Sequence, residues 1–493
     1  MCQPQNIKGD NMLAANFKYR GLIEYFEKIS AIPRPSFHEE KIADYICDFA
    51  KDRGLFFIRD SYNNVFVRLS ASEGREGEEA ILLQGHTDMV CEKNADVEHD
   101  FFTQGIELFE SDGYIRAKGT TLGADNGVAV AVMLYILDGA EGNIKSHPTI
   151  ECLFTATEEK GLVGAAGFDY SVVTATKMLN MDSADDSEII VGCAGGERSE
   201  LELSLNIEKT FLPSAKICVK GLYGGHSGED INRGRANANK IMGRVLNSVL
   251  QKYEFSLISV CGGSKDNAIP RECEAFIVSE NLDLIEKEIA VLYSEIAGEM
   301  SSDDAGFSLS IEKIDNAEAE VLSKEDTKKV IFVMSTVPDG VLKMSTELES
   351  MVEFSRNLGI VDVDAKKGKA EFVFMARSAK RSQVKASSEQ ISAYADMFGG
   401  CVNIASSYPG WDGNADSPLC KTYAKAYKEL FGIECRVSVI HAGLECAIIK
   451  ERCPKLDIIS CGAIVLDLHS PDECLEIASF ERFFTVIKTI IEQ

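Results

Sequence analysis

The most constraining feature of this sequence is a series of apolar, strand-like runs, each followed by polar residues. Strand candidates occupy residues 65–69, 80–83, 149–155, 177–181 and 188–191, and a helical stretch at 126–137 separates the second from the third. Strands that alternate with helices are typical of a parallel or mixed sheet flanked by helices. The sequence therefore predicts an α/β fold for this part of the chain.

Two helices are expected ahead of these strands. Residues 19–32 have helical spacing, and Pro33 stops that helix because proline lacks the backbone donor that a helix needs. Ser36 and Glu39 have the spacing of a capping box, which predicts a second helix that ends at Gly54.

The polar residues stand just past the predicted strand ends. His86 and Asp88 follow the run AILLQG, Glu158 and Glu159 follow ECLFTAT, and Asp182 follows KMLNM. Open α/β sheets bind their ligands at the carboxyl edge of the strands. We therefore expect these five side chains to lie at one edge of the sheet.

The motif GHTD places a carboxylate two residues after a histidine. In an extended segment, residues i and i+2 face the same way, so Asp88 can accept the proton of one imidazole nitrogen of His86. The other nitrogen is then free to bind a metal, with its tautomer fixed by the hydrogen bond. The motif indicates an oriented metal ligand.

The acidic residues are ambiguous when each is taken alone. Asp125, in GTTLGADNG, could simply cap the helix that follows it, and Glu158, Glu159 and Asp182 could be solvated turn residues. Together, however, three or four carboxylates at one sheet edge would repel unless protons or cations neutralise them. A pair of metal ions meets this requirement, and imidazole with carboxylates but no thiolate suits zinc, cobalt or manganese.

Composition narrows the class of protein. The 493 residues are 45% hydrophobic, which predicts two or three folded domains, and the net charge of -27 disfavours a nucleic-acid or anionic membrane partner. No apolar run reaches the roughly 18 residues of a membrane span, and the first 20 residues lack an apolar signal core. The 15 cysteines form no C-x-x-C pair. These features predict a cytoplasmic protein that acts on a small molecule.

The pattern of segments changes twice along the chain. From about residue 196 the α/β pattern gives way to alternating strand-like segments and amphipathic stretches, and it returns after about residue 402. We therefore expect a catalytic domain formed by residues 1–195 and 403–493, interrupted by an inserted domain of residues 196–402.

Several motifs match one family in order. The segments IPRPSFHEE, GHTDMVCEKN, GTTLGADNG, TATEEKGLVGA, GGHSGEDINRGRANANK, NAIPREC, HAGLECAIIKE and LHSPDE span residues 32–473. The chain resembles the aminoacyl-histidine dipeptidases, a branch of the co-catalytic di-zinc peptidases. This resemblance implies a mixed-sheet catalytic domain with an inserted α+β lid domain, and a homodimer formed through that lid.

The resemblance also implies the metal ligands. Asp125 would bridge two divalent ions, most simply zinc, with cobalt or manganese as alternatives. His86 and Asp182 would complete one site, and Glu159 and His469 the other.

Two further roles follow from the same resemblance. Asp88 would orient His86, and Glu158 would be the general base. Members of this family often have a cis peptide bond after the bridging aspartate, which here is the bond between Asp125 and Asn126.

The resemblance assigns the remaining site residues to the substrate. His226 would stabilise the oxyanion, within its own chain or across a dimer, and Asn267 and Arg377 would bind the oxyanion or the substrate carboxylate. Glu445 would recognise the substrate amino group, whereas His441 is interpreted as structural. Asn267 and Arg377 could equally be surface polar residues.

The sequence therefore predicts metal-dependent hydrolysis of dipeptides that have a free amino terminus, with substrates such as β-alanyl-histidine. A related di-zinc tripeptidase, deacylase or carboxypeptidase is the alternative within the same chemistry. A binding protein that kept the fold without catalysis, or carboxylates that serve only as turn residues, would be alternatives of other classes.

Overall fold

A computed structural model describes residue 13 and residues 16–139, 143–314, 318–346 and 351–493. Most of the first 20 residues, in which the sequence shows no apolar signal core, lie outside these residues. The chain forms two compact units. Unit 1 comprises Met1–Gly192, Gly413–Val439 and Leu444–Gln493, and unit 2 comprises Cys193–Asp412 and Ile440–Gly443.

The main sheet of unit 1 is mixed. Its eight strands are β1 (Phe56–Arg59), β2 (Val65–Leu69), β3 (Ile81–His86), β6 (Ile150–Thr155), β7 (Lys177–Ser183), β8 (Glu188–Cys193), β22 (Arg436–Ile440) and β23 (Asp457–Gly462). They are ordered β1-β2-β6-β3-β7-β23-β8-β22. Strand β3 runs parallel to both β6 and β7, so the carboxyl ends of these three strands meet at one edge.

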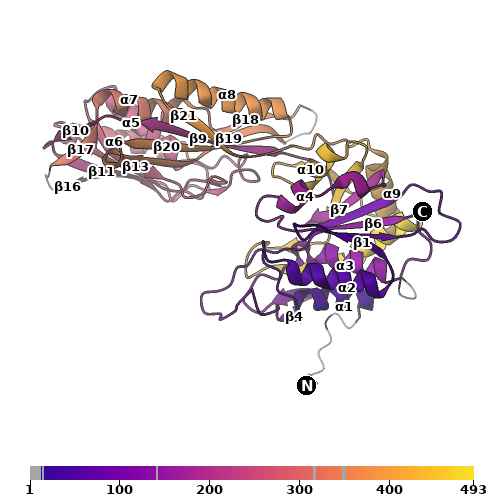
Figure 1. Cartoon of the computed structure of the whole chain (residues 1–493). Helices are drawn as coiled ribbons and strands as arrows, with labels where there is room; N and C mark the ends of the chain where they lie inside the picture. The colour runs from indigo at the N-terminus through magenta and orange to yellow at the C-terminus, as the bar shows by residue number, and fades with distance from the viewer. Residues whose placement is uncertain (1–12, 14–15, 140–142, 315–317, 347–350) are drawn as a thin grey trace. The chain divides into compact units, whose positions relative to one another are not determined.

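The helices of unit 1 cover both faces of this sheet. They are α1 (Arg20–Ser30), α2 (Glu40–Asp52), α3 (Ala124–Asp138), α4 (Val163–Gly167), α9 (Pro418–Phe431), α10 (Glu445–Arg452) and α11 (Ile477–Glu492), with a short 3-10 turn η1 (Tyr170–Val172). Helices α1, α2 and α3 lie together on one side of the sheet (Figure 1). Helix α3 is apolar all round and buried along its length, as a helix in the middle of a core must be.

Glycine allows α3 to approach the sheet closely. A Cβ atom on Gly85 of β3 would lie 2.4 Å from the Cβ atom of Ala129 in α3.

A small second sheet completes unit 1. Its strands are ordered β24-β25-β5-β4 and are β4 (Leu108–Ser111), β5 (Tyr114–Ala117), β24 (Val465–Leu466) and β25 (Cys474–Glu476).

Unit 2 is an antiparallel sheet with helices packed on it. Its strands are β9 (Gly195–Ser204), β11 (Ser214–Lys220), β13 (Ser256–Gly262), β15 (Cys273–Val278), β16 (Ser308–Ile314), β18 (Gly340–Met344), β19 (Val352–Asp364), β20 (Lys369–Ser378) and β21 (Cys401–Tyr408). They are ordered β16-β11-β15-β13-β19-β20-β9-β21, and β18 pairs with β19. Burial alternates along β11, so one face of this sheet forms the core of unit 2.

Four helices complete that core: α5 (Ala238–Leu250), α6 (Leu282–Ala297), α7 (Lys324–Thr336) and α8 (Arg381–Phe398). The remaining elements are two short antiparallel pairs and a 3-10 turn, namely β10 (Ile207–Thr210) with β17 (Ala319–Leu322), β12 (Gly225–His226) with β14 (Ala268–Ile269), and η2 (Ala365–Lys367). The mixed α/β sheet with an inserted α+β unit confirms the expected fold class.

The second boundary of unit 2 falls later than residue 402. Strand β21 pairs with β9 from Cys401 to Tyr408, which keeps this segment in the sheet of unit 2, and the short segment Ile440–Gly443 returns to it. Strand pairing over a separation of about 200 residues leaves no local signal in the sequence.

The predicted capping box is wrong. Helix α2 begins at Glu40 and has no side-chain cap. The Ser36 hydroxyl instead donates to Asp88 Oδ2 at 2.8 Å, and Glu39 Oε1 accepts from Thr157 Oγ1 at 2.6 Å. Both residues make long-range contacts near the strand ends, which outweigh local capping.

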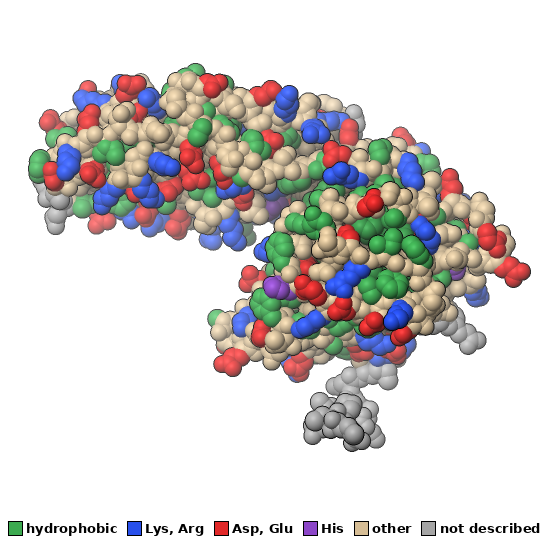
Figure 2. All heavy atoms as spheres, in the orientation of Figure 1, with side chains coloured by type: hydrophobic (Ala, Val, Ile, Leu, Met, Phe, Trp, Pro, Cys, Tyr) green, Lys and Arg blue, Asp and Glu red, His purple; other side chains and the backbone are tan. Residues whose placement is uncertain are grey.

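Two surface features bear on partners. Among the described residues, no helix has both the length and the apolar character required to cross a membrane. On the face shown in Figure 2, Lys and Arg side chains are interspersed with Asp and Glu.

Candidate metal centre

Two groups of metal-ligating side chains in unit 1 share Asp125. In the first, His86 Nε2 lies 2.8 Å from Asp125 Oδ1 and 3.5 Å from Asp182 Oδ1. In the second, His469 Nε2 lies 3.2 Å from both Asp125 Oδ2 and Glu159 Oε1. Within each group the ligand atoms all lie within 4.8 Å of one another. The five residues that the sequence nominated as ligands therefore come together.

The electrostatics of this cluster fit divalent cations. Hydrogen bonds to Asp125 and Glu159 raise the pKa of His469 to about 11, and burial raises the pKa of Glu159. His469 and Glu159 thus retain protons more readily, and these protons offset the negative charge of the carboxylates. Metal ions displace protons from such ligands, and imidazole with carboxylate oxygens is a donor set that suits zinc, cobalt or manganese.

Asp88 connects His86 to the turn that carries the two glutamates. The Asp88 carboxylate is buried, with Oδ1 at 3.3 Å from His86 Nδ1. Its two oxygens also accept the backbone N–H groups of Glu158 at 3.0 Å and Glu159 at 3.2 Å. Burial alone would raise the pKa of Asp88, but the hydrogen bonds, with that of His86 foremost, lower it below the usual range. Asp88 therefore stays ionised and fixes the orientation of His86.

Glu158 lies beside this cluster. One of its carboxylate oxygens is within 4.8 Å of ligand atoms of His86 and Glu159. Burial raises the pKa of Glu158 well above its ordinary value, and the carboxylates of Asp182 and Glu159 add to the effect. A carboxyl group with a raised pKa next to a metal centre can accept and return a proton near neutral pH.

The segment around Asp125 departs from a regular helix. Gly123, at φ 69°, precedes α3, and Asp125 has the non-helical angles φ -81° and ψ 106°. The bond between Asp125 and Asn126 is cis, as the family resemblance implied. The reading of Asp125 as an N-cap is therefore wrong, since its side chain contacts the two histidines instead.

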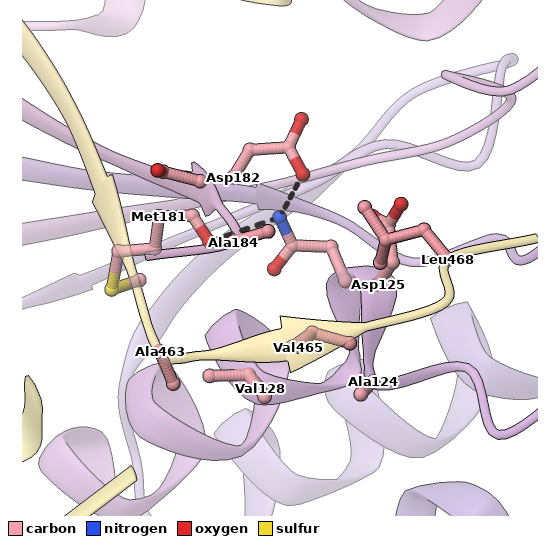
Figure 3. A pocket seen from close by; sticks show the side chains of 11 residues that line it. Ala124, Asp125, Val128, Met181, Asp182, Ala184, Ala463, Val465 and Leu468 are labelled. Carbon is pink, nitrogen blue, oxygen red and sulfur yellow. Dashed lines mark hydrogen bonds between the residues drawn. The ribbon is translucent and has the colours of Figure 1, made fainter. Parts of the chain in front are cut away.

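Asp125 also lines a small pocket of unit 1. Figure 3 shows Asp125 and Asp182 above the apolar side chains of Ala463, Val465 and Val128. The Asn126 amide donates to Asp182 Oδ1 and, at 3.0 Å, to the Met181 carbonyl (Figure 3). Asn126 thereby holds the carboxylate of Asp182 in place.

Glu473 is a functional candidate that the sequence did not reveal. Its carboxylate accepts four consecutive backbone N–H groups at 2.8 to 3.3 Å, from Leu122, Gly123, Ala124 and Asp125. A carboxylate at a helix N-terminus satisfies the orphan donors there. Glu473 thus fixes the segment that presents Asp125. Its only signal was its place in LHSPDE, four residues after His469.

Arg34 is a second missed residue. Its guanidinium is buried, and Nη1 donates to the carbonyls of Thr87 at 3.0 Å and Asp88 at 3.1 Å, while Nη2 donates to that of Gly123 at 2.5 Å. Arg34 therefore ties the end of β3 to the start of α3. In the sequence it is only one position of the motif IPRPSFHEE.

Glu445 lies in a buried polar layer of unit 1. Its side chain has no exposed surface, and Oε2 accepts from Gln84 Nε2 at 2.5 Å and Thr155 Oγ1 at 2.7 Å. Gln84 and Asn180 each precede a nominated ligand by two residues on its strand and bond to each other at 2.6 Å. Glu445 belongs to this polar layer under the metal centre.

The remaining nominated residues lie in unit 2. His226 Nε2 is 3.5 Å from Arg377 Nη2, so these two come together. The Asn267 side chain is exposed, and its backbone carbonyl accepts from Ser227 N at 2.8 Å.

Comparison with known proteins gives the class. Residues 82–493 match the model of peptidase family M20/M25/M40. The chain is 34% identical over 480 residues to the cytosol non-specific dipeptidase of Escherichia coli, covering 96% of this chain and 97% of that protein. The chain belongs to peptidase family M20/M25/M40.

Solved structures agree with this assignment. The aminoacylhistidine dipeptidase of Vibrio alginolyticus superposes with a TM-score of 0.87 at 33% identity, covering 97% of each chain. The aminopeptidase PepT of Bacillus cereus, at 18% identity and a TM-score of 0.53 over 97% of this chain and 98% of its own, shares the fold. The resemblance to the aminoacyl-histidine dipeptidases is confirmed.

Proposed function

We propose that this protein is a metallo-dipeptidase that hydrolyses dipeptides with a free amino terminus, including Xaa-His substrates such as β-alanyl-histidine. One observation carries the proposal: two groups of ligands share Asp125 at the sheet edge, with Glu158 beside them. The names of the relatives from Escherichia coli and Vibrio alginolyticus support the substrate class.

Two divalent ions would occupy this centre, and zinc is the metal we expect there. His86 and Asp182 would hold one, Glu159 and His469 the other, and Asp125 would join both. When bound, such a metal pair lowers the pKa of water and polarises the carbonyl group that is attacked. Cobalt and manganese are the alternatives that the same donor atoms accept.

The protein side chains would handle the protons. Glu158 takes a proton from the attacking water and returns it to the nitrogen of the leaving amine, which requires a carboxyl group with a raised pKa. Asp88 keeps the proton on His86 Nδ1, so that Nε2 remains available as a ligand.

We further propose, on the family resemblance, that residues of unit 2 complete substrate binding. His226 and Asn267 would stabilise the oxyanion, and Arg377 would bind the substrate carboxylate. A homodimer formed through unit 2, and a cytoplasmic location like the one in the name of the Escherichia coli relative, belong to the same proposal.

A substrate panel tests the proposed function. The protein is incubated with dipeptides, tripeptides, N-acetylated dipeptides and N-acyl amino acids, and the products are quantified. We expect dipeptides with a free amino group to be cleaved and blocked ones to be spared. Preferential cleavage of tripeptides or N-acyl amino acids would instead favour the tripeptidase or deacylase alternative.

A further inference from the structure

Four residues of unit 2 form a row across neighbouring strands. Ser355 of β19 lies opposite Arg377 of β20, and Arg377 lies opposite Gly196 of β9. Gly196 in turn lies opposite Tyr408 at the end of β21. Residues directly opposite one another in a sheet present their side chains on the same face. Arg377 and Tyr408 therefore flank a position that has no side chain.

The missing side chain lets Arg377 and Tyr408 meet. Two strand spacings separate their backbones by about 10 Å, yet Arg377 Nη1 donates to the Tyr408 hydroxyl at 2.7 Å. A Cβ atom on Gly196 would lie 2.4 Å from that hydroxyl oxygen. On the other side, a Cβ atom on Gly443 would lie 2.8 Å from Tyr408 Cε2. The two glycines form a slot that fixes the tyrosine ring.

The guanidinium of Arg377 lacks a counter-ion within the described residues. Its side chain is only 4% exposed, no carboxylate there forms an ion pair with it, and Nε has no hydrogen-bond partner there either. A buried charge of this kind is costly unless an anion pairs with it. Because Tyr408 occupies Nη1, the edge formed by Nε and Nη2 remains for a ligand.

The neighbouring histidines add a donor and no negative charge. His226 Nδ1 accepts the backbone N–H of Glu229 at 3.2 Å, so the neutral ring carries its proton on Nε2, which lies 3.5 Å from Arg377 Nη2. Burial, with the charge of Arg377, lowers the pKa of His441 to about 3, and His441 Nε2 bonds to Ser355 Oγ at 2.7 Å. The two histidines therefore supply no anion to Arg377.

We infer that Tyr408 is a positioning residue that holds Arg377 so that its Nε–Nη2 edge binds a planar carboxylate through two parallel hydrogen bonds. The inference rests on the proposed function, in which the carboxylate is the free C-terminus of a dipeptide. An amidated C-terminus offers only one acceptor oxygen and places an N–H group against the second donor. Tyr408 is therefore a determinant of the preference for a free carboxylate.

The test compares β-alanyl-histidine with its C-terminal amide as substrates of the wild-type holoenzyme and of Tyr408→Phe. We expect a higher KM for the amide than for the acid with the wild type. Tyr408→Phe should raise the KM for the acid about tenfold, since one hydrogen bond to Arg377 is lost, and leave kcat and the KM for the amide within about twofold. Tyr293→Phe, on the surface of α6, is the matched control and should change neither KM.

A second variant probes the slot from the opposite strand. Gly196→Ala should displace the Tyr408 hydroxyl and raise the KM for the acid at least as much as Tyr408→Phe. Gly298→Ala, where an added Cβ atom has its nearest contact at 3.4 Å, is its control. Thermal unfolding of each variant identifies any loss of fold, and Tyr408→Phe, which removes a single oxygen, decides the outcome if Gly196→Ala does not fold.

Each outcome has a separate meaning. An unchanged ratio of the two KM values in folded Tyr408→Phe would overturn the role of Tyr408 and leave the proposed function intact. Equal KM values for the acid and the amide with the wild type would overturn the carboxylate site itself. No hydrolysis of any dipeptide by the wild type would overturn the proposed function and this inference with it.

Discussion

The carboxylates of the centre differ in what they contact. Asp125, Glu159 and Asp182 face the two histidines, which are the positions that metal ligands require. Asp88 and Glu473 instead accept backbone N–H groups and hold the segments that carry those ligands. Glu159 and Asp182 are visible in the sequence because each follows an apolar run, whereas Asp125 is assigned through the family resemblance. Asp88 is visible because it follows His86 by two residues, whereas Glu473 contacts only backbone donors, which any residue type supplies.

Glu158→Ala tests the general base. Loss of the group that moves the proton should lower kcat about a hundredfold to ten-thousandfold, because general acid–base catalysis contributes roughly that much. The metal content should not change, since Glu158 lies outside both groups that share Asp125. Initial rates of β-alanyl-histidine hydrolysis give kcat, and elemental analysis gives the metal content. Exposed Glu98→Ala is the control, and normal turnover by Glu158→Ala would refute the assignment.

Glu473→Gln tests the support of Asp125. The amide places N–H groups against backbone donors that the carboxylate now satisfies, which leaves buried donors unpaired. We expect metal affinity to fall about tenfold to a hundredfold, as for other residues that orient ligands. At saturating metal most of the activity should return. Competition with a chelator measures the affinity, and unchanged affinity would show that Glu473 does not position Asp125.

At the scale of elements, the three parallel strands β6, β3 and β7 carry two polar layers. The outer layer holds His86 and Asp182, and the inner layer holds Gln84, Asn180 and Thr155, closed by Glu445 from the first turn of α10. Because side chains alternate along a strand, residues two apart stack on the same face. The inner layer therefore fixes the strands from which the metal ligands project.

The pH dependence of stability tests this layer. Burial raises the pKa of Glu445 to about 8, against about 4.3 for an unfolded glutamate. The folded state thus binds an extra proton between these values. The stabilisation of the folded state by this proton is complete below pH 4 and is lost as pH rises toward 8. Over that range the free energy of unfolding falls by at most about 1.4 kcal/mol per pH unit. Glu445→Gln cannot ionise and should lack this decline.

Chemical denaturation of metal-stripped protein at pH 5, 6, 7 and 8 measures the effect, since nearby divalent cations would lower the pKa of Glu445. The unfolding free energy of the wild type should fall relative to that of Glu445→Gln as pH rises from 5 to 8. Exposed Glu98→Gln should follow the wild type at every pH. Parallel curves for wild type and Glu445→Gln would show that Glu445 is ionised throughout.

The strands and the ligands could be predicted from the sequence, whereas local caps and boundaries could not. Strands β2, β3, β6, β7 and β8 lie where apolar runs predicted them, because burial in a sheet demands such runs. Capping, the commonest local use of these residue types, is the prediction for Ser36 and the local alternative for Asp125. Both bond instead to residues far along the chain, and such contacts leave no short-range pattern.

At the scale of the whole molecule, the metal centre depends on both parts of unit 1. His86, Asp125, Glu159 and Asp182 precede unit 2 in the sequence, whereas His469 and Glu473 follow it. Strand β23 brings the second part back by pairing in parallel with β7. The peptidase family and the inserted unit could be recognised from ordered motifs, but this pairing follows only from the structure.

Metal removal and replacement test the central claim that the five ligands hold a pair of catalytic ions. Wild-type protein is stripped with a chelator, and hydrolysis of β-alanyl-histidine is followed while zinc or cobalt is added back. We expect no hydrolysis by the stripped protein, and restored turnover with two ions bound per chain. Full activity without metal, or saturation at a single ion per chain, would contradict the account.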